Sequence, residues 1–177
     1  MKPGDGKKKG GIFEREIAKT LSLWISEGKN PNIFWRSASS GAKATQNRKF
    51  GNTDDAQCGD ICLVDPAGIF LIKRFFIELK HYKNLHMESM IYGNAISGSI
   101  LEFWDKAKSE SYSYGKTPLL IAKQNHQRIL VITDALGWMF LTDLYGMPIN
   151  ATTIHNHNAY IFDFEWLIKN CDPNYLY

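Results

Sequence analysis

An apolar run that ends in FFIELKHY, residues 75–82, indicates a strand buried in the core of the fold. Glu78 and Lys80 stand near its end, where a buried strand is expected to carry hydrophobic side chains. Side chains alternate between the two faces of a strand, so residues two positions apart project together, with their bases roughly 7 Å apart. Phe76, Glu78 and Lys80 are therefore expected to share a face. A Glu-x-Lys pair alone is typical of a solvated strand end, so the rest of the chain decides its meaning.

Asp60 is the acidic residue that the sequence is expected to bring next to this pair. The runs DICLV, residues 60–64, and GIFLIKRFFIELK, residues 68–80, flank the turn signal DPAG. An Asp-Pro-x-Gly turn between two strand-like runs predicts an antiparallel hairpin. The outer ends of a hairpin lie side by side, so Asp60 is expected beside Glu78 and Lys80.

The remaining pattern alternates helices and strands. Phe13, Ile17, Leu21 and Trp24 form an apolar stripe that predicts a helix from Gly10 to a stop at Gly28. A strand over residues 32–37 and a long polar loop over 37–60 should follow. Later elements are expected to be a helix over 99–115, strands over 117–124 and 128–134, and a helix over 162–170. This order predicts an α/β fold with a mixed sheet and helices packed on it.

The 177 residues suffice for one domain, and 44% hydrophobic residues indicate a folded globule. We expect a single domain over residues 1–177, with a basic, flexible N-terminus at 1–9 and a C-terminal extension at 134–177 of unknown role. No apolar run reaches the roughly 18 residues that span a bilayer, and no signal-peptide type of segment follows the start. The expected location is the cytoplasm, without a membrane partner. Three cysteines without paired spacing support neither a disulfide framework nor a zinc site.

Basic residues form two clusters, although the net charge is only +3. Such clusters can neutralise phosphates, yet a basic start is commonly a solubilising tail, so charge alone leaves the partner open. The segment SASSGAK, residues 37–43, lacks the Gly-Lys-Ser/Thr ending of a nucleotide-binding loop, so no nucleotide cofactor is expected. The clusters are Lys2, Lys7, Lys8 and Lys9 at the start, and Arg36, Lys43, Arg48 and Lys49 in and before the polar loop.

Four short motifs in this order resemble the archaeal-type Holliday junction resolvases of the PD-(D/E)xK nuclease superfamily. They are KGGIFERE, residues 9–16, WRSASSGAK, residues 35–43, GDICLV, residues 59–64, and IELK, residues 77–80. The matching positions are Lys9, Gly10, Glu14 and Arg15; Arg36, Ser40, Gly41 and Lys43; Asp60; and Glu78 and Lys80. The resemblance covers residues 9–83 and implies a restriction-endonuclease-like mixed central sheet flanked by helices. Gly59 departs from it, because the superfamily name has Pro at that position.

Phosphodiester hydrolysis gives this set of residues a chemical reason. Mg²⁺, for which Mn²⁺ is expected to substitute, prefers carboxylate and water oxygens, polarises the phosphate and makes hydroxide available near neutral pH. Asp60 and Glu78 would be the main ligands, and Glu14 would bind the ion through water or hold a second one. Lys80 would either activate the attacking water or neutralise charge that grows on the phosphate, and the sequence leaves both roles open. The resemblance adds the carbonyl of Leu79 as a metal ligand.

The leading hypothesis is a Mg²⁺-dependent DNA endonuclease, selective for branched DNA such as four-way junctions. Symmetric cutting across a junction needs two sites, which predicts a homodimer with C2 symmetry. By resemblance, Ser40 lies in a loop that contacts the DNA or the site, and it is expected among the catalytic residues with Glu14, Asp60, Glu78 and Lys80. The expected DNA-binding residues are Lys9, Arg15, Arg36, Ser40, Lys43, Arg48 and Lys49. The alternatives are a nuclease of the same fold with another DNA substrate, restriction-type or phage DNA-processing, and a non-catalytic DNA-binding module.

Overall fold

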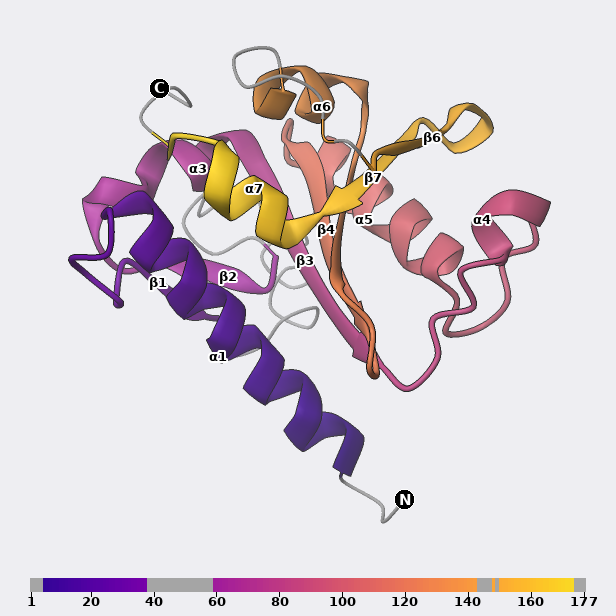
Figure 1. The fold of residues 1–177 in the computed structure, drawn as a ribbon, viewed down its shortest axis with the longest axis horizontal. Helices are drawn as coiled ribbons and strands as arrows, with labels where there is room; N and C mark the ends of the chain where they lie inside the picture. Colours follow the sequence, from indigo (N-terminus) through magenta and orange to yellow (C-terminus); the bar gives the residue numbers. More distant parts are fainter. Residues whose placement is uncertain (1–4, 38–58, 143–147, 149, 174–177) are drawn as a thin grey trace.

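The computed structural model describes residues 5–37, 59–142, 148 and 150–173 (Figure 1). Its main sheet is mixed: the first two neighbouring strands run parallel, and every further pair is antiparallel. The fold is therefore the predicted α/β class, a mixed central sheet flanked by helices. In spatial order the strands are β3 (Phe75–Tyr82), β4 (Thr117–Gln124), β5 (Ile129–Thr133), β7 (Ala159–Asp163) and β6 (Thr152–Ile154).

Helix α5 (Ile100–Ser113) connects the parallel strands β3 and β4 and covers one face of the sheet. Ser99 begins this helix, because its side chain accepts a hydrogen bond from the backbone N–H of Glu102. Trp104 is fully buried beneath it, against Leu120 and neighbouring apolar side chains of the sheet. The predicted helix over 99–115 and the predicted strands over 117–124 and 128–134 are thus confirmed.

Helices α1 (Asp5–Ile25) and α7 (Phe164–Asn170) pack on the opposite face of the sheet from α5 (Figure 1). The predicted apolar stripe of α1 is buried along its whole length, and the helix begins at Asp5 rather than at Gly10. At its end, the Trp24 indole N–H donates to the carbonyl of Cys171 over 2.7 Å. This contact ties the C-terminal end of α1 to the residue that follows α7.

The predicted hairpin between residues 60 and 80 is wrong. Strand β2 (Ile61–Leu63) pairs with β1 (Phe34–Arg36) in a separate two-stranded sheet. After β2, the Asp65 side chain accepts from the N–H of Ala67 and begins a short 3-10 helix, Pro66–Gly68, which continues into α3 (Ile69–Arg74). An Asp followed by Pro is also a helix-start signal, and a short apolar run cannot be assigned to helix or strand by periodicity alone.

Residues after 134 complete the main sheet. They form α6 (Ala135–Thr142), the antiparallel pair β6 and β7, and α7. Strand β7 pairs with β5, and Phe162 and Leu167 are buried in the same core cluster as α1. Among the described helices, none is long and apolar enough to cross a membrane.

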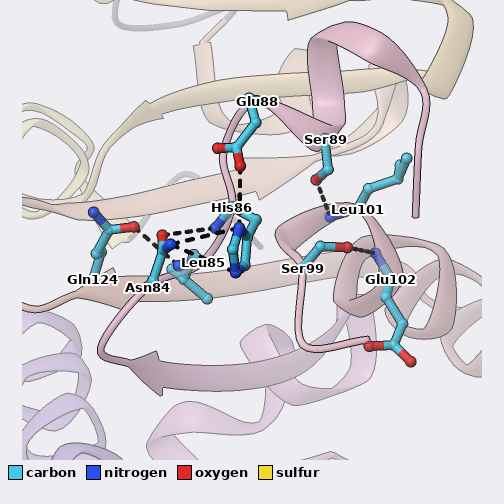
Figure 2. Close-up of polar contacts among 9 residues, drawn as sticks. All are labelled: Asn84, Leu85, His86, Glu88, Ser89, Ser99, Leu101, Glu102 and Gln124. Carbon is cyan, nitrogen blue, oxygen red and sulfur yellow. Dashed lines mark hydrogen bonds and ion pairs between the residues drawn. The ribbon is translucent and has the colours of Figure 1, made fainter. Parts of the chain in front are cut away.

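The connection between β3 and α5 is held by polar contacts at two points in its first half (Figure 2). The N–H of Leu85 donates to Gln124 Oε1 over 2.9 Å. The Ser89 hydroxyl accepts from the N–H of Leu101 over 3.3 Å, which ties the first residue of α4 (Ser89–Tyr92) to the first turn of α5. Ile91 and Tyr92 of α4 are 74% and 73% exposed, so this anchored segment presents apolar side chains to solvent.

Candidate active site

Asp60 lies against the outer edge of β3. Its N–H donates to the carbonyl of Ile77 over 2.9 Å, and its Oδ2 accepts from the N–H of Leu79 over 2.8 Å. The adjacent residue Gly59 forms an isolated parallel bridge with Ile77. Asp60 therefore reaches Glu78 and Lys80 as predicted, but through a parallel contact rather than through a hairpin.

Gly59 is required by the geometry of this contact. Its φ is +85°, a conformation that non-glycine residues rarely adopt, and a Cβ there would lie 2.5 Å from the carbonyl oxygen of Ile77. Proline has φ fixed near −65°, so the superfamily's Pro could not take this position in the same backbone conformation. Ser37 closes the other side: its N–H donates to the carbonyl of Asp60 and its hydroxyl donates to that of Gly59, each over 2.9 Å.

Glu78 and Lys80 share a face of β3, as their spacing predicts. The Lys80 ammonium contacts Oε1 of Glu78 and lies 3.9 Å from Oδ2 of Asp60, so one cation serves two buried carboxylates. The same ammonium lies 5.6 Å from the centre of the Phe103 ring on α5. At this distance the face of the ring attracts the ammonium.

Glu14 approaches the cluster from α1. Its side chain is 16% exposed, and its Oε2 lies 3.5 Å from Nε of Arg36 on β1. Burial raises the pKa of Glu14, and the negative charge of Asp60 raises it further, while Arg36 opposes both effects. The carboxylate of Glu14 is therefore close enough to Asp60 to be repelled by it.

The pKa values of Glu78 and Lys80 are both raised, but for different reasons. Burial, and then the charge of Asp60, raise the pKa of Glu78 from 4.5 to about 7, although Lys80 opposes the shift. Burial alone would lower the pKa of Lys80, but the carboxylates of Glu78 and Asp60 outweigh it and raise that pKa. Lys80 is therefore a cation at neutral pH.

The donor set fits a hard cation. The charge of Asp60 raises the pKa of both Glu78 and Glu14, so a cation that enters beside Asp60 would stabilise their charged forms, and oxygen donors are those that Mg²⁺ prefers. Within the part of the chain that the structure describes, no group of three or more Asp, Glu, His or Cys side chains is arranged so that it could hold a metal ion. Instead, Glu14 is turned toward Arg36, and Lys80 lies between the carboxylates of Asp60 and Glu78.

The predicted DNA-binding residues divide into described and undescribed ones. Lys9 contacts the side chain of Asn125 in the turn between β4 and β5, and Arg15 is exposed on α1 next to Arg36. Ser40, Lys43, Arg48 and Lys49 lie outside the described residues. Sequence reasoning missed Ser37, whose contacts with Gly59 and Asp60 give no pattern in the sequence.

Comparison with known families shows which family the chain belongs to. Residues 5–176 match the family described as "Phage putative PDDEXK endonuclease". The chain belongs to this family. The PD-(D/E)xK superfamily that the motifs indicate is thereby confirmed, and the family's description as an endonuclease supports a nuclease with DNA as its substrate. The matched phage PD-(D/E)xK family differs from the archaeal-type resolvases that the motifs resemble. Neither a curated protein nor a solved structure matches the chain.

Proposed function

We propose that this member of the phage PD-(D/E)xK family hydrolyses DNA with a divalent metal ion at the cluster of Asp60, Glu78 and Lys80. One observation carries the proposal: the Lys80 ammonium contacts Glu78 and lies 3.9 Å from Asp60 at the outer edge of β3. Paired carboxylates repel DNA phosphates, so a module that only binds DNA has no use for them.

Asp60 and Glu78 would hold the metal ion directly, with the carbonyl of Leu79 as a third ligand. The N–H and C=O of one strand residue point to the same side. Because the N–H of Leu79 donates to Asp60, its carbonyl also points to the outer edge of β3. Glu14 would contact the ion through water. When bound, the ion supplies a polarised phosphate and a water of lowered pKa.

Lys80 would act as a cation rather than as a base. Its pKa is raised by Glu78 and Asp60, so an uncharged amine that could accept a proton is scarce near neutral pH. A fixed ammonium beside the metal ligands would orient the attacking water and stabilise the charge that grows on the phosphate.

Branched DNA remains the proposed substrate, because the motifs over residues 9–83 resemble those of junction resolvases. The matched family's description favours a second candidate, a phage DNA-processing endonuclease that acts on other DNA. The two differ in one measurable property, which is the dependence of cutting on a branch point.

We further propose a homodimer that forms through α4. Ile91 and Tyr92 are adjacent exposed side chains of α4, which follows the contacts at Leu85 and Ser89 (Figure 2). Contiguous exposed apolar side chains mark protein interaction sites. A C2 dimer would bury this surface against its copy and supply the two sites that paired incisions need.

The test incubates the wild type, Glu78→Ala and the control Glu165→Ala with a labelled four-way junction and a linear duplex of matching sequence in Mg²⁺. Glu165 is an exposed carboxylate on α7, outside the proposed site. Paired incisions in the junction alone, absent only in Glu78→Ala, support the branched substrate. Equal cutting of both DNAs supports the second candidate. A wild type that binds both DNAs and cuts neither, in Mg²⁺ or Mn²⁺, would show a non-catalytic module.

A further inference from the structure

A pocket of about 290 Å³ opens between α1 and β1, next to the proposed active site. Arg15 and Lys19 line it from the helix, and Trp35 and Arg36 line it from the strand. Its volume is close to the lower end of ligand pockets, which is roughly 300 Å³. The pocket can therefore enclose a group of the size of one nucleotide.

Trp35 supplies a flat apolar surface in this pocket. It is 53% exposed, whereas its neighbour Phe34 is 1% exposed, because successive side chains of β1 face opposite ways. The core does not require a tryptophan at an outward-facing strand position. Indole rings stack on nucleic-acid bases of any sequence, because every base has an aromatic face.

Arg15, Lys19 and Arg36 line the same pocket as Trp35. Among the described residues, no carboxylate pairs with Arg15 or Lys19, and Arg36 has only Glu14 at 3.5 Å. The guanidinium groups of Arg15 and Arg36 also lie close to the same point of α1: a Cβ added to Gly11 would overlap Arg36 Nη1 and lie 3.8 Å from Arg15 Nη1. Two guanidinium groups at one point favour a shared anion, and phosphate matches their geometry.

We infer that this pocket binds one unpaired nucleotide of the DNA, with its base on Trp35 and its phosphate between Arg15 and Arg36. The inference rests on the proposed nuclease function and extends it to the choice of substrate. A base inside an intact duplex is stacked and paired, so it cannot reach Trp35 without a cost of a few kcal/mol. DNA with an unpaired nucleotide avoids that cost and binds more tightly.

The pocket also connects substrate choice to the proposed metal site. Arg36 lines the pocket and contacts Glu14, whose carboxylate is repelled by Asp60. A phosphate that attracts Arg36 weakens its hold on Glu14. The Arg36 side chain therefore lies at both the nucleotide pocket and the carboxylate cluster.

Fluorescence anisotropy without divalent metal tests the inference on the full chain. The probes are a duplex with one unpaired nucleotide, the same duplex with an abasic unit there, and a fully paired duplex. Stacking on one aromatic ring predicts that Trp35→Ala weakens binding of the first probe by about 5- to 150-fold and leaves the paired duplex unchanged. Trp35→Phe should keep part of the preference. Met139→Ala, which removes an equally exposed side chain on α6, should keep all of it.

The abasic probe needs no variant, so a folding defect cannot obscure the answer. Wild type should bind it more weakly than the probe with the unpaired nucleotide, because the abasic unit keeps the phosphate but has no base to stack on Trp35. Equal binding of all three probes by wild type, or equal losses on all three in Trp35→Ala, would overturn the inference. If the wild type still cuts DNA in Mg²⁺, only the nucleotide pocket is refuted. If it neither binds the probes nor cuts any DNA, the nuclease proposal fails as well.

Discussion

The backbone N–H of Leu79 donates a 2.8 Å hydrogen bond to Oδ2 of Asp60. This contact joins the side chain of one proposed metal ligand to the backbone between Glu78 and Lys80. The carboxylate of Asp60 therefore has two functions, one in positioning β3 and one in the proposed chemistry, and two substitutions can separate them.

Asp60→Asn should keep the fold and abolish cutting. The amide oxygen can still accept the hydrogen bond from Leu79, but the negative charge is lost. Changing a group that only orients a metal ligand typically costs about 10–100-fold in metal affinity or activity, so changing a ligand itself should lower the cutting rate by about 100-fold or more. Asp60→Ala should in addition leave the buried N–H of Leu79 unpaired, which costs about 1–3 kcal/mol of unfolding free energy. Urea unfolding and cutting rates of both variants measure the difference. Equal stability of the two variants would contradict this role of the hydrogen bond.

Glu78 should make the stability of the metal-free protein depend on pH. Its pKa is about 7 when folded against an ordinary value of 4.5, so the folded state binds more protons between these values. The free energy of unfolding should therefore fall as the pH rises from 4.5 through about 7, and this component should vanish in Glu78→Gln. Melting curves at several pH values, with Glu165→Gln as control, measure the slope. Because metal competes with the proton, Mg²⁺ should raise the melting temperature more at pH above 7 than below.

Gly59→Ala should destabilise the fold by more than glycine-specific backbone strain alone. Gly28 has a similar φ of +83°, with nothing within 4 Å of an added Cβ, so Gly28→Ala reports the strain by itself. That strain costs about 1–3 kcal/mol. Gly59→Ala adds the clash with Ile77, so its unfolding free energy should fall further, and cutting should be lost because Asp60 moves. Equal losses in the two variants would refute the close contact.

Gly11→Ala should separate stability from activity. Alanine in a helix interior is about 0.5–1 kcal/mol better than glycine, so Gly10→Ala and Gly11→Ala should both raise the stability of α1. Only the second displaces Arg36, since a Cβ on Gly10 meets Glu14 Oε1 at an ordinary 3.9 Å. Gly11→Ala should therefore bind and cut DNA more weakly. Melting and cutting assays on both variants measure the difference. Equal DNA binding and cutting by Gly10→Ala and Gly11→Ala would contradict the prediction.

Ile91→Glu should convert the proposed dimer to monomers without unfolding them. The side chain is 74% exposed, so a charge there costs little within one chain but a great deal inside an apolar interface. Sedimentation at several concentrations measures the change. Leu136→Glu, at a half-exposed site on α6, is the matched control and should remain dimeric. A monomeric wild type would remove the dimer from the proposal.

The long elements could be predicted because their patterns were strong. The stripe from Phe13 to Trp24 matches the helical period, and the start of β3 is a continuous apolar run that fits a strand buried on both faces. Residues 68–74 were misassigned to a strand, since Leu71 and Ile72 are both buried in a short helix and give no period. The strand at residues 61–63 was predicted correctly, and only its partner was wrong. Strands β6 and β7 were missed because they are short, at three and five residues, and β6 is only partly buried.

The grouping of the site residues was predicted correctly from a wrong premise. Asp60 does lie beside Glu78 and Lys80, but a hydrogen bond to Ile77 brings it there. No pattern in the sequence indicates that contact. Trp35 was assigned to a strand, yet its exposure depends on which face of β1 the core covers. Such facts follow from tertiary packing and not from local pattern.

The contact of Asp60 with β3 also covers part of an exposed strand edge, where other chains could otherwise pair. Strand β3 ends the main sheet, and an open strand edge is a template for pairing with other chains. Asp60 occupies this edge at two points, the carbonyl of Ile77 and the N–H of Leu79. The residue proposed to bind metal thus also covers an aggregation-prone strand edge, so loss of this contact should lower solubility as well as catalysis.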